Sequence, residues 1–184
     1  MVLTFLAEGF EEIEALTPVD VLRRADVTVR TVAIGAGNGK TVTGSHGIPV
    51  VADLTAEEAL ALTEKIEMVI LPGGMPGAKN LEEDKTVTSF LRKSMREGFY
   101  VASICAAPMI PGKMGMLRGK RATCYPGFEQ HLDEAILTGG RVEIDCGQIT
   151  ANGMGSALDF ALTLCGLLKG DEAAEKIRSA ILAK

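Results

Sequence analysis

The chain has 184 residues, of which 47% are hydrophobic and 23% are charged, and its formal net charge at pH 7 is −5. This length fits one domain (residues 1–184) with a sizeable core, and the composition excludes a disordered chain. The acidic balance argues against nucleic acid or an anionic membrane as the main partner and favours a small molecule or a protein. No apolar run is long enough for a membrane span and the start lacks the basic region of a signal peptide, so we expect a cytoplasmic protein.

Short apolar runs alternate with helical patterns along the chain. The apolar or alternating runs predict strands at residues 2–7, 27–34, 41–53 (as two short strands), 67–74, 99–104, 120–127 and 141–151. Helical spacing of apolar residues predicts helices at residues 11–25, 56–62, 85–98, 155–168 and 171–184. Such alternation is typical of βαβ units, so the sequence predicts an α/β sandwich whose mostly parallel sheet has helices on both faces.

In sheets of this kind, ligands bind at the carboxyl ends of the strands. The residues that follow predicted strands are therefore the candidates for chemistry. They are Glu11, Glu12 and Glu14 after the first strand, Gly73 and Gly74 after "VILP", and Cys105 after "FYVASI".

Cys105 lies where a buried strand is predicted to turn into a helix. A nucleophile on such a turn is exposed at the top of the sheet, and the small residues Ala106 and Ala107 leave room for a substrate. The start of a helix also offers free N–H groups and the positive end of its dipole, which favour a thiolate. From position alone, a buried structural cysteine is an equally good interpretation.

A reactive thiol needs more than a helix terminus. Lowering a cysteine pKa from ~8.5 to ~5.5 corresponds to about 4 kcal/mol, whereas a helix N-terminus supplies at most ~2 kcal/mol. A charge-assisted hydrogen bond adds ~1.5–3 kcal/mol, and a protonated carboxyl group can donate one. We therefore expect Glu14 to be that donor, with the alternative that it is a solvated carboxylate, as we expect for Glu11 and Glu12.

The loop "LPGGMPGAKNL" (residues 71–81) could direct the N–H groups of Gly73 and Gly74 toward an oxyanion, or it could be a plain tight turn. It has neither the GK[ST] ending of a phosphate loop nor the GxGxxG pattern.

No metal or cofactor is expected. His46 and His131 have no ligand partner at a useful spacing. The four cysteines form no CxxC pair, so we interpret all of them as reduced thiols: Cys105, Cys124, Cys146 and Cys165. Cys146 and Cys165 fall in strand-like and helical apolar contexts and are expected to be inert.

Taken together, the segments "AEGFEEIEALTPVDVLRRA", "VILPGGMPGAKNL" and "ICAAP" resemble the ThiJ/PfpI superfamily, in particular its Parkinson-disease-protein (DJ-one) branch and the bacterial YajL-type relatives. The resemblance extends over essentially the whole chain. It implies a flavodoxin-like three-layer sandwich of the class I glutamine amidotransferase type, usually as a homodimer. It also implies a nucleophile-elbow cysteine at Cys105, a protonated Glu14, and oxyanion N–H groups at Gly73, Gly74 and Ala106.

The chain departs from this family pattern at the rim of the expected pocket. Tyr125 stands where catalytically active relatives carry a histidine, and His46 stands where some relatives place an arginine. Because tyrosine is a poor base at neutral pH, the change argues against a Cys–His–Glu triad. Ala106, not histidine, follows the cysteine, which argues against a protease, and no downstream His-x-Glu pair supports a glutamine amidotransferase.

The resemblance implies two functions. In the first, Cys105 attacks methylglyoxal or glyoxal, Glu14 moves the proton, and the N–H groups of Gly74 and Ala106 hold the oxyanion, in cofactor-independent glyoxalase or deglycase chemistry. In the second, the protein is an oxidative-stress sensor or chaperone whose Cys105 is oxidised to a sulfinate.

Overall fold

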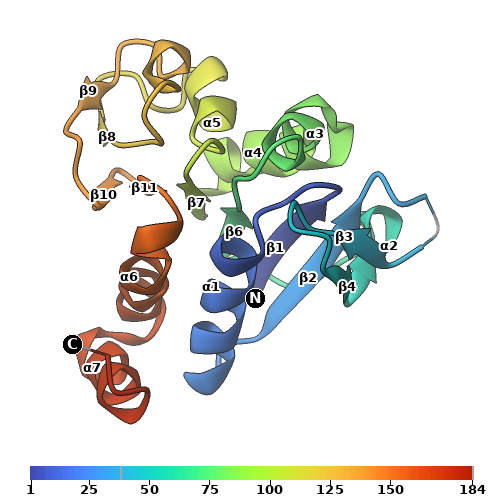
Figure 1. Ribbon diagram of the computed structural model, residues 1–184, viewed down its shortest axis with the longest axis horizontal. Helices are drawn as coiled ribbons and strands as arrows, with labels where there is room; N and C mark the ends of the chain where they lie inside the picture. The colour runs from blue at the N-terminus through green and yellow to red at the C-terminus, as the bar shows by residue number, and fades with distance from the viewer. Residues whose placement is uncertain (38, 184) are drawn as a thin grey trace.

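The predicted apolar runs form the central sheet. Within residues 1–37 and 39–183, which this computed structural model describes, seven strands pair in the order β10-β11-β7-β6-β1-β2-β5 (Figure 1). Their bounds are β1 (Val2–Ala7), β2 (Val29–Ile34), β5 (Leu54–Thr55), β6 (Met68–Leu71), β7 (Tyr100–Ile104), β10 (Val142–Asp145) and β11 (Gln148–Ala151). Neighbouring strands in this sheet run parallel, except that β10 is antiparallel to β11. The mostly parallel sheet is therefore confirmed.

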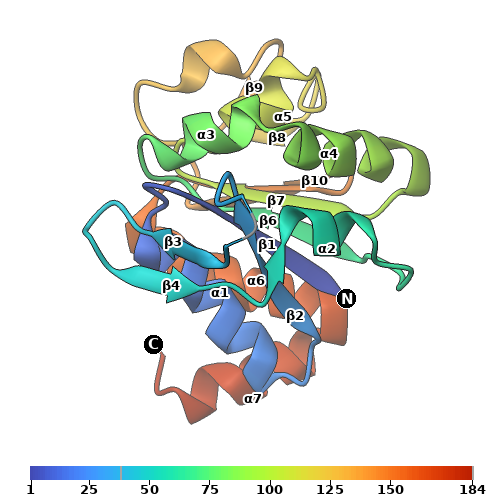
Figure 2. The same cartoon turned by 90° about the vertical axis from the view of Figure 1, so that its right-hand side faces the viewer.

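Helices cover both faces of the sheet (Figure 2). One face carries α1 (Glu12–Arg24), α6 (Ala157–Lys169) and α7 (Asp171–Ala180), and the other carries α2 (Ala56–Leu60), α3 (Gly77–Glu83), α4 (Lys85–Glu97) and α5 (Met109–Lys113). Successive side chains of a strand point to opposite faces, so Val2 packs in the core under α1 and α6, and Leu3 packs in the core under α4. The two cores confirm the flavodoxin-like three-layer sandwich.

The hairpin of β3 (Thr41–Thr43) and β4 (Pro49–Val51) forms as predicted, but residues 141–151 do not form one strand. They fold into the antiparallel pair β10–β11, whose turn contains Cys146 at φ 44° and Gly147 at φ 79°. Two consecutive positive φ values define the tight turn that joins twisted antiparallel strands. The expected strand-like, apolar context of Cys146 is therefore wrong, because Cys146 lies in the turn and is exposed to solvent.

The segment 120–127 is also less regular than predicted. Only β8 (Arg121–Ala122) is a strand, and it pairs with β9 (Ile136–Leu137) in a separate small sheet. The short elements α3, α5, η1 (Glu129–His131) and η2 (Met154–Ser156) were not predicted, because elements of about two turns or fewer show little periodicity.

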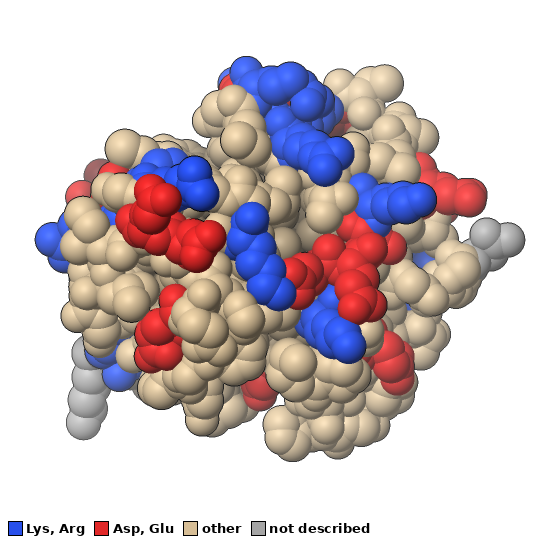
Figure 3. Space-filling view, turned by 90° about the horizontal axis from the view of Figure 1, so that it is seen from above, with Lys and Arg blue, Asp and Glu red and all other residues tan. Residues whose placement is uncertain are grey.

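The surface carries charges of both signs. Figure 3 shows basic and acidic side chains lying beside one another, with uncharged surface between the groups. Among the described residues, no helix is both long enough and apolar enough to cross a bilayer.

Candidate functional site

Cys105 follows the last residue of β7, at the carboxyl edge of the sheet. Its backbone is left-handed, with φ 63°, a conformation that is unfavourable for a residue with a side chain. Two hydrogen bonds hold it there: its N–H donates to the Ala151 carbonyl at 2.9 Å, and its own carbonyl accepts from the Tyr125 N–H at 2.9 Å. The conformation leaves the half-buried Cys105 side chain between the two cores.

No helix begins directly after Cys105. The next helix, α5, starts only at Met109 and has five residues, so the expected contribution of a helix dipole is wrong. Instead, the backbone N–H groups of Ala106 and Gly74 hydrogen-bond to the sulfur and favour its charged form. The local positive field comes from two N–H groups of different loops.

Glu14 lies in the first turn of α1 and is only 1% exposed. Its carboxyl group is hydrogen-bonded to the Cys105 side chain, and its Oε2 accepts from the Gly73 N–H at 2.9 Å. Burial raises the pKa of Glu14 to about 7, helped by the nearby charge of Glu11 and opposed by the hydrogen bonds from Cys105 and Gly73. Glu14 is thus a buried carboxyl that can exist in both protonation states near neutral pH.

Burial, together with the ionised Glu14, raises the pKa of the Cys105 thiol to about 12 and outweighs the two N–H groups. This direction is opposite to the lowered pKa that the sequence suggested. A lowered pKa would require Glu14 to stay protonated, whereas an ionised carboxylate repels a neighbouring thiolate. The two groups therefore form a coupled pair in which the first negative charge is shared between oxygen and sulfur.

The N–H groups of Gly73 and Gly74, both expected as oxyanion donors, face different partners. The N–H of Gly73 is directed at Glu14, whereas the N–H of Gly74 faces the sulfur. A Cβ on Gly73 would lie 2.6 Å from Glu14 Oε2 and 2.7 Å from Cys105 Cβ, so only glycine fits. The N–H groups that face the sulfur are therefore those of Gly74 and Ala106.

The backbone of Tyr125 contacts Cys105 through the hydrogen bond described above, and Tyr125 is 51% exposed. The preceding Cys124 is buried in a separate small cluster with Leu117, Ala122 and Leu132. Burial, with a smaller effect of the Glu129 charge, raises the pKa of Cys124 to about 11.

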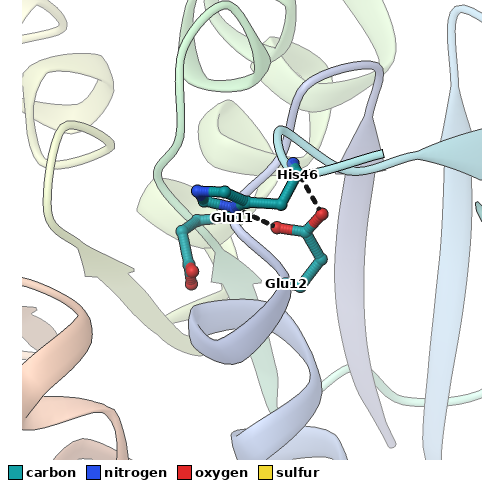
Figure 4. A group of neighbouring side chains, drawn as sticks. All are labelled: Glu11, Glu12 and His46. Carbon is teal, nitrogen blue, oxygen red and sulfur yellow. Dashed lines mark hydrogen bonds and ion pairs between the residues drawn. The ribbon is translucent and has the colours of Figure 1, made fainter. Parts of the chain in front are cut away.

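His46 comes from the β3–β4 loop and pairs with Glu12 at the start of α1 (Figure 4). Its Nδ1 lies 2.9 Å from Glu12 Oε2, and its backbone N–H donates to Glu12 Oε1 at 2.8 Å. Burial raises the pKa of Glu12, but these hydrogen bonds outweigh it and lower that pKa to about 2. The same contact raises the pKa of His46. His46 thus anchors the hairpin loop to the helix that carries Glu14.

Glu11 and Glu12 are buried, so their expected role as solvated carboxylates is wrong. One ligand atom each from Glu11, Glu12 and His46 lie within 4.8 Å of one another, a set that could hold a metal ion. However, Glu11 Oε2 already accepts the Glu14 N–H at 2.7 Å, and both oxygens of Glu12 accept bonds from His46. Hydrogen bonds within the protein account for this cluster.

A left-handed cysteine at the end of a central strand, on a flavodoxin-like sheet, defines a structural class, that of proteins with a cysteine on a sharp turn at the carboxyl edge of the sheet. Within that class, the sequence profile described as "DJ-1/PfpI family" matches residues 1–166. The chain belongs to this family, which confirms the resemblance.

Individual relatives agree with this assignment. The chain is 36% and 37% identical to the DJ-1 homologs A and B of Arabidopsis thaliana over its whole length, although it spans only 46% and 41% of those longer proteins. A deglycase of Pyrococcus horikoshii is 35% identical over 73% of this chain and 77% of the relative. Among solved structures, a DJ-1 superfamily protein of Salmonella typhimurium has a TM-score of 0.92 at 32% identity, covering 100% of this chain and 98% of that one. Toxoplasma gondii DJ-1, solved in an oxidized form, has a TM-score of 0.92 at 33% identity, with 98% and 97% covered.

Proposed function

We propose that the protein converts small reactive carbonyls such as methylglyoxal or glyoxal by cofactor-independent glyoxalase or deglycase chemistry, within a role in stress protection. The observation that carries this proposal is the coupled pair of Glu14 and Cys105. A carboxyl with a pKa of about 7 both accepts and donates a proton at neutral pH, which is what a proton shuttle requires. The family also includes a relative named as a deglycase.

The proposed reaction begins when the Cys105 sulfur attacks the aldehyde carbon while the thiol proton passes to Glu14. The oxyanion of the hemithioacetal accepts hydrogen bonds from the N–H groups of Gly74 and Ala106, which already face the sulfur. Glu14 first returns the thiol proton to the oxyanion and then, as the carboxylate, takes the proton from the former aldehyde carbon and delivers it to the adjacent carbonyl carbon. The proton on the former aldehyde oxygen passes to the neighbouring oxygen, which leaves a thioester of the 2-hydroxy acid. Water cleaves the carbon–sulfur bond of this thioester, which releases lactate from methylglyoxal, or glycolate from glyoxal, and restores the thiol.

The test is turnover of methylglyoxal followed by NMR of the product. We expect lactate with the unmodified protein and none with Cys105→Ala. Cys146→Ala is the matched control, because it removes an exposed thiol outside this site and should keep full activity. Equal rates for the unmodified protein and Cys105→Ala would reject the proposal.

A second function is supported by Tyr125, which replaces the histidine of active relatives, and by the relative solved in an oxidized form. In this function Cys105 is oxidised to a sulfinate that the same N–H groups stabilise, and the protein acts as an oxidative-stress sensor or chaperone. Peptide mass spectrometry after mild peroxide treatment tests it, with the fully buried Cys165 as internal reference. Oxidation of Cys105 no faster than that of Cys165 would exclude the sensor.

We further infer a cytoplasmic homodimer with no nucleic acid or membrane partner. Three exposed apolar side chains support the dimer: Ile13 on α1 and Ile48 and Val51 on the β3–β4 hairpin, which are 49%, 52% and 73% exposed. The Ser45 N–H donates to the Phe10 carbonyl at 2.7 Å, so the hairpin and the start of α1 adjoin each other. Light scattering should show that Val51→Lys has the mass of a monomer, whereas an unchanged dimer mass would mean that the interface lies elsewhere.

A further inference from the structure

Glu11 takes part in a closed set of hydrogen bonds that joins the start of α1 to the loop after β6. Its Oε2 accepts the Glu14 N–H at 2.7 Å, and its own N–H donates to the Gly73 carbonyl at 3.0 Å. The Gly73 N–H donates in turn to Glu14 Oε2 at 2.9 Å. These three bonds form a ring through Glu11, Gly73 and Glu14, so each residue is fixed relative to the other two.

The backbone of Glu11 also limits where Gly74 can lie. Gly74 has φ 86°, and a Cβ built on it would collide with the Glu11 backbone nitrogen. The two backbones are therefore in direct contact, next to the Gly74 N–H that faces the Cys105 sulfur. The position of Glu11 thus affects both Glu14 and one of the N–H groups that face the sulfur.

Capping alone does not account for a glutamate at this position. The residues that best cap the start of a helix have short side chains: Ser, Thr, Asp and Asn. Glu11 has a longer side chain, is only 9% exposed, and bears a charge that raises the pKa of Glu14. A neutral side chain of the same length would accept the Glu14 N–H without this electrostatic effect.

Few other charges act on Glu14. The segments that adjoin it carry these titratable or charged side chains: Glu8, Glu11, Cys105, the pair of Glu12 and His46, and the pair of Arg141 and Asp159. Among them, Cys105 and Glu11 shift the pKa of Glu14, whereas the charges within each pair offset each other. Glu11 is therefore the charge that acts on Glu14 while Cys105 is a neutral thiol.

We propose that Glu11 is a positioning residue for the Glu14–Cys105 pair: its hydrogen bonds fix Glu14 and the Gly73–Gly74 loop relative to each other, and its negative charge favours the protonated form of Glu14. That form returns a proton to the oxyanion in the proposed reaction, so Glu11 extends this step to higher pH. The kinetic part of the proposal rests on the proposed function. The hydrogen bonds and the charge effect are properties of the protein without substrate.

Two variants separate position from charge. Glu11→Gln keeps an oxygen that accepts the Glu14 N–H and removes the charge, whereas Glu11→Ala removes both. Asp84→Asn is the matched control, because Asp84 caps α4 by accepting the N–H groups of Thr86 and Val87. The first measurement needs no substrate: NMR follows the carboxyl carbon of Glu14 against pH, and Glu14→Gln assigns its signal.

The pKa of Glu14, about 7 in the unmodified protein, should fall by roughly one unit in Glu11→Gln and Glu11→Ala and stay unchanged in Asp84→Asn. Hydrogen exchange of the Glu14 N–H should be roughly ten-fold faster in Glu11→Ala and close to the unmodified rate in Glu11→Gln. An unchanged or raised pKa of Glu14 in folded Glu11→Gln would overturn the proposal. Melting temperatures that fall as in Asp84→Asn, with no shift of this pKa, would reduce Glu11 to a helix cap and would also overturn it.

The pH profile of methylglyoxal turnover tests the link to function. The limb of the profile that reports Glu14 should move to lower pH by the same amount in Glu11→Gln, with a maximal rate within about three-fold of the unmodified protein. The maximal rate of Glu11→Ala should fall roughly ten-fold, because Glu14 and the loop are no longer fixed. A profile that does not move although the pKa of Glu14 has shifted would overturn the kinetic part. An unmodified protein without turnover would reject the proposed function, and the NMR titration would still decide the role of Glu11.

Discussion

The coupling between Glu14 and Cys105 is tested most directly by removing the carboxylate in two ways. Glu14→Leu removes both the charge and the hydrogen bond. Glu14→Gln removes the charge but keeps the shape, since its Oε1 can accept the Gly73 N–H while its Nε2 faces the sulfur. The pKa of the Cys105 thiol is about 12 in the unmodified protein, and its value in both variants shows how much of this rise is due to the neighbouring charge.

The size of the effect follows from the contact. A unit charge about 4 Å away contributes ~4 kcal/mol at an effective dielectric constant of ~20, or about 3 pKa units. Glu14→Leu should therefore lower the pKa of the thiol from its raised value of about 12, while burial, the largest cause of that raised value, remains. The amide of Glu14→Gln adds a hydrogen bond to the thiolate of ~1.5–3 kcal/mol, which lowers the pKa by a further ~1–2 units.

The same arithmetic applies to the unmodified protein. With Glu14 protonated, the charge repulsion is absent and the carboxyl group can donate to the sulfur, so the pKa of the thiol falls toward that of Glu14, which is about 7. The free-energy difference between carboxylate with thiol and carboxylic acid with thiolate is therefore smaller than the values of about 7 and about 12 suggest when taken separately. This smaller difference is the physical basis of the proposed shuttle.

The assay is ultraviolet absorbance of the thiolate during a pH titration, with the Cys105→Ala titration subtracted. We expect two steps in the unmodified protein, a partial one near neutral pH and the rest at high pH, and one step in each variant. Turnover should fall by ~100-fold or more in both, because neither moves a proton between carbons. A single step well below neutral pH, with a thiol pKa that rises in both variants, would refute the reasoning.

The remaining predictions concern the surroundings of the pair. Gly73→Ala should lower the melting temperature and abolish turnover, because overpacking costs ~1–3 kcal/mol. Gly155→Ala, whose Cβ meets nothing within 4 Å, should do neither, and equal melting temperatures of the two variants would contradict this prediction. Tyr125→His should raise methylglyoxal turnover ~10-fold or more if it supplies the missing base, and an unchanged rate in a folded variant would show that it does not. His46→Gln should lose the stability that His46 gains from its raised pKa, which is fully present below pH 6.5 and is lost as pH rises through that raised value. Glu12, whose pKa is lowered to about 2, contributes stability above pH 4.5 and loses this contribution as the pH falls through 2. The melting temperatures of the unmodified protein and of His46→Gln should therefore differ most between pH 4.5 and 6.5. Equal melting temperatures across this range would mean that the pair does not form in solution.

Most of the sheet could be predicted because its strands are buried on both faces and read as continuous apolar runs. All six residues of β1 are buried, and such a run has few alternatives to a central parallel strand. The hairpin of β10 and β11 was missed for the opposite reason. Its turn depends on positive φ at Cys146 as well as at Gly147, and a cysteine gives no signal for that conformation.

The identity of the candidate site residues could be predicted, but their electrostatics could not. Position after a strand identified Glu14, Gly73, Gly74 and Cys105. The direction of the thiol pKa depends on which group each N–H faces, and the sequence does not show that Gly73 serves Glu14 while Gly74 serves the sulfur. The contacts that cover Glu12 were likewise hidden, because they come from His46 in a hairpin loop 34 residues away along the chain.

These hidden contacts explain how the start of α1 prepares Glu14. Glu11 Oε2 caps the helix by accepting the Glu14 N–H at 2.7 Å, which fixes the first turn and with it the direction of the Glu14 side chain. The charge of Glu11 also raises the pKa of Glu14, toward the form that can donate a proton. Glu12, held by His46, fastens the same turn to the hairpin. The three glutamates in these four residues thus have different roles. Glu11 caps the helix, Glu12 anchors the hairpin, and Glu14 pairs with Cys105 and shares a proton with it.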